Sequence, residues 1–404
     1  MRILQINAVY EKYSTGRTTK ELHEYLQSNH IESYVASPDL GGLVDNCYCI
    51  GNRIDRKMHA LCSRVSGKQG YFSTKATKGL LNYMDDISPD IVVLRNLHGN
   101  YINLNLLLEY IRRKNIITIL VLHDCWFYTG KCVYYIEDNC SKWKNGCGEC
   151  PALKKGNPSF FFDKSNKMLK DKERHFEGIK NLAVVGVSKW VADDVKLSIL
   201  HGAKVITYIY NWIDLDLFSP GIMSNVRQMY CLGDKKIVLG VAMSWNVAKG
   251  IEVFNKLADT LPDEYQIVLI GDYSKVKNPN KKIKFVGTIN KSSDLAKFYS
   301  EAYVFVNPSI QETFGKTTAE SMACGTPVIA YNGTAMPELI GKDGKCGILI
   351  DSLEADEYLE AICSIKYRHV NYYRENCRNR ATTLFDKNTN ISKYLELFNS
   401  MLYD

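Results

Sequence analysis

The sequence contains no run of about 18 apolar residues, the length that a membrane-spanning helix requires. It also lacks low-complexity tracts and long blocks of like charge, so a disordered chain is not expected. The first residues, MRILQIN, are too short and too interrupted for a signal peptide, and we therefore expect a cytoplasmic protein. What is present is a composition typical of a globular protein, with 46% hydrophobic and 24% charged residues.

Length and cysteine content narrow the class further. A chain of 404 residues is too long for one ordinary core and predicts two domains of roughly 200 residues each. The 13 cysteines are an odd number in a chain without an export signal. Reduced thiols are therefore favoured over a disulfide framework.

Short apolar runs alternate with helical patterns along the whole chain. Residues 2–9 have the pattern of a buried strand, followed by a predicted turn at 14–17 and a helix that continues through Leu26. Further runs with strand character lie at 33–36, 91–94, 116–122, 182–187, 205–209, 236–241, 266–270, 283–286, 303–306 and 327–330. This alternation predicts an α/β fold with parallel sheets that helices cover on both faces.

The pattern also predicts how the chain divides. The alternation restarts with the run at 236–241 after a loop that begins near Asn211, so we expect an N-terminal domain at 1–210 and a C-terminal domain at 211–384. Residues 385–404 carry apolar residues at helical spacing and are expected to form one helix that packs back on the N-terminal domain. Ligands of open α/β sheets bind at the carboxyl ends of the strands, so the loops after the strands are the candidate sites.

One such loop carries the strongest chemical signal. Residues 307–327 read NPSIQETFGKTTAESMACGTP, in which a loop gives way to a helix near Lys316. Gly315 permits close approach of the backbone, and the free N–H groups at the start of the helix form an anion site for a diphosphate, which Lys316 reinforces. Glu312 and Glu320 lie on either side, and carboxylates accept hydrogen bonds from paired sugar hydroxyls. This layout suits a nucleotide sugar.

The two acids, the following Met-Ala-Cys-Gly-Thr-Pro-Val-Ile and a later Pro-Glu together resemble the signature of retaining family 4 glycosyltransferases of the GT-B fold. The resemblance implies two Rossmann-like domains that face each other across a cleft. It also implies that Glu312 contacts the donor sugar near the reaction centre and that Glu320 contacts the nucleotide ribose. The donor-binding residues expected between them are Thr313, Phe314, Gly315, Lys316 and Thr317.

The segment VAMSWNVAKG at 241–250 stands where the family usually has Gly-Arg followed by Lys-Gly. Lys249 matches the lysine and is expected to stabilise charge on the leaving diphosphate. The arginine is absent, and Arg17 or Lys316 is expected to substitute for it. Gly271 and Thr288 follow strands and resemble the loops that line the nucleotide base.

The N-terminal domain supplies further candidates. Gly16 and Arg17 lie in the first βα connection, which faces the donor in the resembling family. His123 ends a predicted strand and matches the family histidine, so we expect it to donate a hydrogen bond to a sugar hydroxyl, with Asp124 holding its tautomer or binding the acceptor. His98 is a second acceptor-binding candidate. In this family the leaving phosphate is thought to take the acceptor proton, so no dedicated protein base and no catalytic cofactor is expected.

A cysteine-rich insertion at 125–151 resembles a subgroup that acts in bacterial exopolysaccharide, capsule or O-antigen assembly, colanic-acid enzymes among them. Within it, a Cys-x2-Cys pair and two earlier cysteines suit a tetrahedral structural zinc. The four cysteines are Cys132, Cys140, Cys147 and Cys150. Two disulfides and four unlinked thiols remain open as alternatives.

Lysines and an arginine at 154–174 surround the aromatic triplet Phe160–Phe162. This stretch suits anionic membrane lipid or an anionic substrate. The alternative is a solvated helix with an apolar underside, because Met168, Leu169 and Phe176 lie near helical spacing.

We expect a glycosyltransferase that moves a hexose-type sugar from a UDP- or GDP-linked donor to a saccharide acceptor carried on polyprenyl diphosphate, at the inner face of the cell membrane. The alternatives are an epimerase or phosphorylase of the same fold, and a zinc-dependent binding protein. Nucleic acid is not an expected partner.

Overall fold

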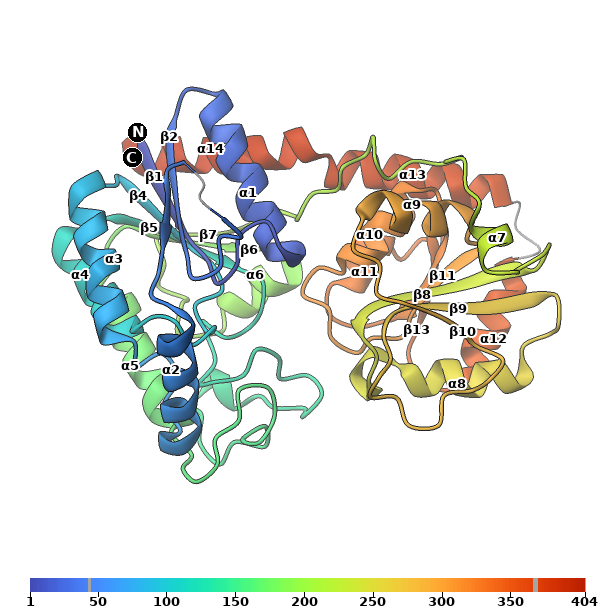
Figure 1. Cartoon of the computed structure of the whole chain (residues 1–404), viewed down its shortest axis with the longest axis horizontal. Coiled ribbons are helices and arrows are strands. Elements are labelled where there is room, and N and C mark those ends of the chain that lie inside the picture. Colours follow the sequence, from blue (N-terminus) through green and yellow to red (C-terminus); the bar gives the residue numbers. More distant parts are fainter. Residues whose placement is uncertain (43–44, 366–369, 404) are drawn as a thin grey trace. The chain divides into compact units, whose positions relative to one another are not determined.

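The computed structural model describes residues 1–42, 45–365 and 370–403. The chain forms two compact units (Figure 1), one made of Met1–Tyr210 with Ile391–Asp404 and the other of Asn211–Asn390. Among the helices of the described residues, none combines the length and the apolar character needed to cross a bilayer.

The first unit is built on a seven-stranded sheet in the order β3-β2-β1-β4-β5-β6-β7, and all its neighbouring strands pair in parallel. The central strands are almost wholly buried because Ile, Leu and Val dominate them. The strands are β1 (Arg2–Ile6), β2 (Glu32–Ser37), β3 (Cys47–Cys49), β4 (Ile91–Leu94), β5 (Ile117–Leu122), β6 (Leu182–Gly186) and β7 (Val205–Tyr208).

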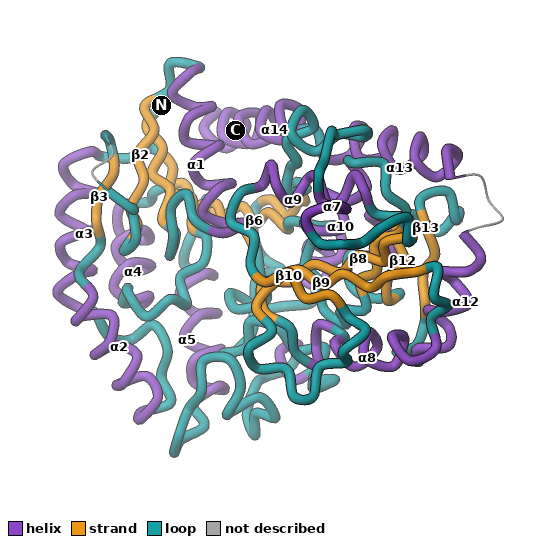
Figure 2. The backbone as a smooth tube through the Cα atoms, turned by 45° about the vertical axis from the view of Figure 1, so that its right-hand side comes forward, coloured by secondary structure: helices purple, strands orange, loops and turns teal. Residues whose placement is uncertain are grey.

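Helices connect these strands and flank the sheet (Figure 2). They are α1 (Tyr13–Ser28), α2 (Arg53–Ser66), α3 (Thr74–Ile87), α4 (Leu104–Lys114), α5 (Ser165–Glu177), α6 (Lys189–Val195) and α14 (Lys387–Tyr403). Between β5 and α5, residues 123–164 contain only the short 3-10 helix η1 (Lys142–Lys144). The four candidate metal ligands lie in this insertion.

The second unit has a six-stranded parallel sheet in the order β10-β9-β8-β11-β12-β13. Its strands are β8 (Lys236–Ser244), β9 (Tyr265–Asp272), β10 (Lys284–Gly287), β11 (Val304–Asn307), β12 (Val328–Tyr331) and β13 (Gly347–Ile350). Its helices are α7 (Val226–Met229), η2 (Val247–Lys249), α8 (Ile251–Thr260), α9 (Ser292–Glu301), α10 (Lys316–Ala323), α11 (Met336–Ile340), α12 (Ala355–Ser364) and α13 (Val370–Phe385). The predicted architecture of two parallel α/β sheets is thus confirmed.

Strand order determines which loops meet at the carboxyl edges. Strands β8 and β11 are neighbours in the second sheet, so the loop that carries Lys249 lies beside the loop that carries Glu312. Strands β4 and β5 are neighbours in the first sheet, which brings the loop of His98 beside that of His123 and Asp124. Residues far apart in the sequence are therefore adjacent at two places, one in each unit.

Candidate functional site

The clearest contact of the second unit joins Lys249 and Glu312. The Nζ atom of Lys249 lies 2.6 Å from Oε1 of Glu312 and 3.2 Å from Oγ of Ser309. Both side chains of this ion pair remain partly exposed. A solvent-accessible cation and carboxylate therefore stand side by side at the edge where the sequence predicts the donor.

Backbone constraints hold Lys249 in this position. Asn246 accepts a hydrogen bond from the Lys249 amide at 3.1 Å and so caps η2. Gly250 follows with φ +74°, and a Cβ atom there would lie 2.3 Å from Cγ of Pro308. Only glycine permits this close approach, which brings the lysine against the loop after β11.

Glu312 lies in the loop after β11, and the loop after β12 fixes its backbone. The Glu312 amide donates to Oγ1 of Thr334 at 3.1 Å, and the Ala335 amide donates to the Glu312 carbonyl at 3.2 Å. The glutamate is thus fixed through its backbone, while its carboxylate is left to interact with Lys249.

Helix α10 begins next to this pair, as the sequence predicts. Gly315 at its N-cap has φ +86°, and a Cβ atom there would lie 2.3 Å from Cε of Met336. Within α10, which the structure describes in full, no acidic residue lies in the first turn and the N-cap makes no side-chain hydrogen bond. The first amides of a helix have no intrahelical acceptor, so this end is suited to an anion.

Of the other residues of this segment that were predicted to bind the donor, two are partly exposed and two are buried. Lys316 and Thr317 are partly exposed in the first turn of α10. Thr313 and Phe314 are buried, and the Phe314 ring packs edge-on against Phe385 with 5.4 Å between ring centroids. Packing in the unit thus accounts for the Phe314 side chain without a ligand.

Glu320 is 2% exposed and lies one turn inside α10. The hydroxyl of Tyr299 donates to its Oε2 atom at 3.2 Å. A ribose hydroxyl can reach this carboxylate only if the side chains that cover it move.

Of the two residues predicted to line the nucleotide base, Gly271 lies within a strand and Thr288 lies in a groove. Gly271 lies in β9 with φ +128°, and a Cβ atom there would be 1.8 Å from the Ala242 carbonyl oxygen, so close strand packing alone requires glycine. Thr288 follows β10 and lines a groove of about 390 Å³ with residues of α7 and α9.

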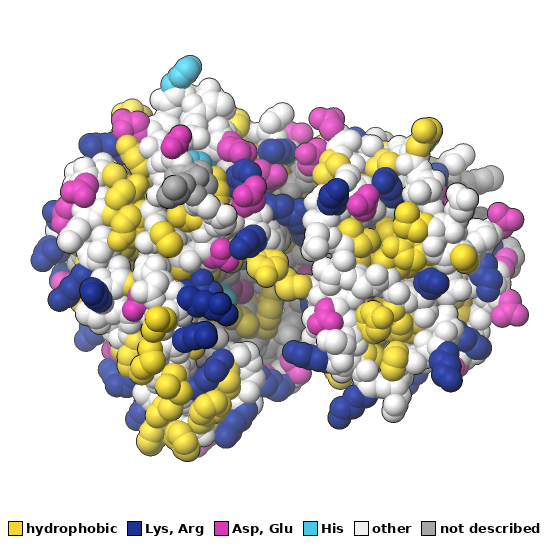
Figure 3. Space-filling view, viewed as in Figure 1, with side chains coloured by type: hydrophobic (Ala, Val, Ile, Leu, Met, Phe, Trp, Pro, Cys, Tyr) yellow, Lys and Arg dark blue, Asp and Glu magenta, His cyan; other side chains and the backbone are white. Residues whose placement is uncertain are grey.

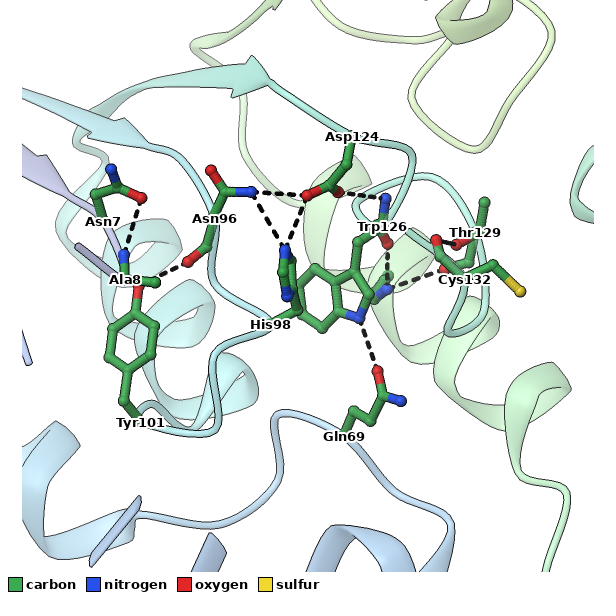
Figure 4. A network of polar contacts seen from close by, with 11 residues as sticks. Asn7, Ala8, Gln69, Asn96, His98, Tyr101, Asp124, Trp126, Thr129 and Cys132 are labelled. Carbon is green, nitrogen blue, oxygen red and sulfur yellow. Dashed lines mark hydrogen bonds and ion pairs between the residues drawn. The ribbon is translucent and has the colours of Figure 1, made fainter. Parts of the chain in front are cut away.

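In the first unit, His98, Asn96 and Asp124 form one polar network (Figure 4). Oδ2 of Asp124 lies 2.8 Å from Nε2 of His98 and accepts from Nδ2 of Asn96 at 2.7 Å, while Oδ1 accepts from the Trp126 amide at 2.9 Å. Burial alone would raise the pKa of Asp124. The interactions with His98 and the Trp126 amide outweigh burial and hold this pKa below its usual value. Burial alone would lower the pKa of His98, yet the Asp124 carboxylate raises it. The two predicted acceptor residues are therefore a coupled pair.

His123 has a partner that the sequence analysis missed. Nη1 of Arg95 lies 3.0 Å from Nε2 of His123, and the guanidinium also lies 6.0 Å from the centre of the Tyr394 ring. Arg95 is buried, which lowers its pKa, and its Nε and Nη2 atoms have no hydrogen-bond partner among the described residues. Because guanidinium only donates, Nε2 of His123 must accept, and the imidazole is neutral with its proton on Nδ1. The sequence feature that could have identified Arg95 is its position directly after the strand β4, where ligand-binding loops begin.

The predicted turn at 14–17 was wrong. Helix α1 already begins at Tyr13, and the chain turns earlier, with positive φ at Glu11 and Tyr13. Gly16 is buried inside the first turns of the helix, where the Glu11 amide donates to its carbonyl at 3.1 Å. Gly16 thus allows close packing within the first unit, and Arg17 lies beside it on the helix, partly exposed.

The four candidate zinc ligands of the insertion line one cavity of about 20 Å³, together with Trp143. The Sγ atoms of Cys132 and Cys150 are 3.9 Å apart, and the Gly130 amide donates to Sγ of Cys147 at 3.3 Å. All the cysteines are free thiols. No group of three or more His, Cys, Asp or Glu side chains in the described residues is arranged as a ready metal site.

Comparison with known proteins identifies the class to which this geometry corresponds. Residues 235–366 match the family described as glycosyl transferases group 1. An uncharacterized 41.2 kDa protein in the cps region of Klebsiella pneumoniae is 29% identical over 150 residues, which are 36% of this chain and 40% of that protein. D-inositol 3-phosphate glycosyltransferase from Mycobacterium sp. (strain JLS) is 27% identical over 183 residues, which are 42% of each chain.

Among solved structures, that of Anabaena Alr3699/HepE in complex with UDP superimposes with a TM-score of 0.69 at 16% identity, over 99% of this chain and 100% of that one. The fold is therefore GT-B, and over residues 235–366 the chain is similar to glycosyl transferases group 1, in agreement with the resemblance that the sequence motifs predicted. This chain spans about two fifths of the length of these two curated relatives.

Proposed function

We propose that this protein transfers a sugar from a nucleotide-diphosphate donor to a saccharide acceptor, with retention of anomeric configuration, in the synthesis of a bacterial surface polysaccharide. The observation that carries the proposal is the contact of Lys249 with Glu312 and Ser309 beside the amide-bearing start of α10. The match to glycosyl transferases group 1 and the similarity to a protein of a cps region support it.

The roles follow from charge. A bound diphosphate brings negative charge to the start of α10, where the first-turn amides and Lys316 attract it. The ammonium of Lys249 then exchanges part of its contact with Glu312 for the phosphate that leaves. Glu312, released from the lysine, accepts hydrogen bonds from hydroxyls of the donor sugar. Glu320 is the proposed contact of the ribose.

His123 is proposed to act as a neutral hydrogen-bonding group. Since Arg95 donates to Nε2, the imidazole does not serve as a cationic acid in this arrangement. We assign the acceptor proton to the leaving phosphate, and we assign acceptor binding to the coupled pair of His98 and Asp124. The proposed acceptor is a saccharide on a polyprenyl diphosphate, which places the enzyme in the cytoplasm at the membrane face.

Release of nucleotide from a panel of UDP- and GDP-sugars tests the proposal. The wild-type protein should release nucleotide from at least one donor, slowly with water and faster with an acceptor. Lys249→Ala and Glu312→Ala should each lower the rate at least about ten-fold, because each removes a charge that the transition state needs. Lys256→Ala is the matched control, since that exposed lysine of α8 also pairs with a glutamate, Glu354, at 3.8 Å. No release from any donor, or equal rates in all four proteins, would refute the proposal.

A further inference from the structure

An apolar surface lies on the first unit, formed by α2 and the end of the cysteine-rich insertion. Helix α2 turns four large side chains outward at intervals of four, three and four residues, which places them on one helical face. His59 and Ser63 lie on the opposite face and are buried. The outward side chains are Ile54, Met58, Leu61 and Val65.

The aromatic triplet Phe160–Phe162 continues this surface. It precedes α5 and is not part of that helix, whose own apolar side is buried as the helical spacing predicted. The Phe160 amide donates to the Arg64 carbonyl of α2 at 2.8 Å. Gly67, at the end of α2, is so close to Phe162 that a Cβ atom would lie 2.2 Å from the Phe162 carbonyl oxygen. The triplet is therefore fixed against the end of α2.

We call these seven side chains the apolar face; they are between 42% and 71% exposed. Figure 3 shows apolar side chains gathered over the lower part of the first unit, where α2 and the insertion lie, with Lys and Arg side chains around them. Contiguous exposed apolar surface of this kind is uncommon unless something covers it.

Six cations surround the apolar face, and within the described parts of the chain none of them pairs with a carboxylate. Lys154 donates to the Phe160 carbonyl at 3.3 Å, and Nζ of Lys164 lies 5.6 Å from the centre of the Phe162 ring. The nearby Asp55 and Asp163 are occupied by backbone amides. The cations are Arg53, Lys57, Arg64, Lys68, Lys154 and Lys164.

We propose that the apolar face docks on an anionic lipid bilayer. Phenylalanine and aliphatic side chains enter the boundary between headgroups and acyl chains, while the six cations contact lipid phosphates. Charge favours this occupant over a second copy of the chain, because a two-fold contact through the same face would bring the two sets of cations together. The inference rests on the proposed function for its membrane setting and names the surface that makes the contact, which would bring a lipid-linked acceptor within reach. Docking itself does not require glycosyl transfer, so the two can be tested separately.

Co-sedimentation of the full chain with vesicles tests the docking. The protein should bind vesicles of phosphatidylcholine with phosphatidylglycerol, bind much less to phosphatidylcholine alone, and dissociate as salt is raised. The triple variant Phe160→Ser, Phe161→Ser, Phe162→Ser should lower the partition coefficient at least about ten-fold. The pair Ile54→Ser and Leu61→Ser tests α2 independently and should have a similar effect.

Exposed apolar residues elsewhere provide the control. Leu197→Ser with Met223→Ser removes similar exposed area outside the apolar face and should leave binding unchanged. All variants should keep the wild-type melting temperature and nucleotide-sugar binding, which separates this test from that of the proposed function. The proposal would be overturned if the wild-type protein did not co-sediment with anionic vesicles, or if the apolar-face variants bound them as the wild type does. A wild-type dimer that these variants dissociate, without any vesicle binding, would assign the face to a second copy instead.

Discussion

At the scale of single residues, two glycines determine where the charged groups of the candidate donor site lie. Gly250 lets the backbone after Lys249 pass within contact distance of Pro308, and Gly315 lets α10 begin against Met336. Both have positive φ, so a side chain there would be strained by conformation as well as by contact.

Gly250→Ala should destabilise the second unit by roughly 2–4 kcal/mol, since it combines left-handed backbone strain with a clash against Pro308. It should also weaken donor binding by moving Lys249. The control is Gly233→Ala, where φ is +54° but no atom lies within 4 Å of the added Cβ. Urea unfolding of both variants measures the difference, and equal losses would show that the contact with Pro308 contributes nothing.

Buried histidines make stability depend on pH. Burial lowers the pKa of His23 to about 4, and its Nδ1 atom lies 2.7 Å from Oγ of Ser33. Between pH 6.5 and 4 the unfolded chain binds a proton that the folded chain does not, so the free energy of unfolding falls as pH falls through this window. The loss from His23 reaches about 3 kcal/mol at most.

His23→Gln should therefore flatten the fall in the urea midpoint between pH 7 and pH 4.5, whatever it costs at pH 7. His30→Gln changes an exposed histidine of the same unit and should keep the wild-type slope. A wild-type midpoint that does not change with pH would contradict the assignment.

The sequence was sufficient to identify some site residues and not others. Lys249 and Glu312 each stand in a local sequence motif, one at 241–250 and the other at 307–327, so both could be recognised without coordinates. Arg95 and Thr334 act through contacts to loops that are distant in sequence, which only the order of the strands brings together. Their contributions could not be read from local pattern.

At the scale of elements, most strands were predictable because short apolar runs mark them, and α10 because glycines stand at both its ends. Strands β3 and β13 were missed, since each is short and one begins at Gly347, whose backbone packs against the Val328 carbonyl. The start of α1 was misplaced because Gly16 resembles a turn residue, although the turn is made by Glu11 and Tyr13. Local propensity did not predict a non-glycine residue at positive φ.

The cysteine insertion has almost no regular structure, and buried aromatic side chains such as Tyr128 and Trp143 anchor it in the core of the first unit. We propose one structural zinc held by Cys132, Cys140, Cys147 and Cys150. Tetrahedral zinc with Zn–S bonds of about 2.3 Å separates two sulfurs by roughly 3.8 Å, and Cys132 and Cys150 are 3.9 Å apart. All four line the same cavity, and Cys140 and Cys147 are the proposed third and fourth ligands.

Metal analysis of protein purified without chelator should find about one zinc per chain. Cys150→Ser should lower the zinc content and the melting temperature, whereas Cys231→Ser, which changes an exposed cysteine of the second unit, should change neither. Zinc well below one per wild-type chain would remove this proposal and favour free thiols or disulfides.

At the scale of the whole molecule, each unit has its own sheet and its own buried core. The chain passes from the first unit to the second between Tyr210 and Asn211, and returns within α14 at Ile391. Tyr394 of that helix packs against Arg95, the partner of His123. The last residues of the chain therefore support a candidate active-site residue of the first unit, a connection that helical spacing alone could not predict.

The central claim is that Lys249 binds the diphosphate and Glu312 the sugar. Calorimetric titration of a nucleoside diphosphate and of its nucleotide sugar into wild type, Lys249→Ala and Glu312→Ala tests it most directly. We predict that Lys249→Ala weakens both ligands at least about ten-fold, and that Glu312→Ala keeps the affinity for the diphosphate but loses the affinity that the sugar adds. Wild-type affinity for both ligands in both variants would contradict the account.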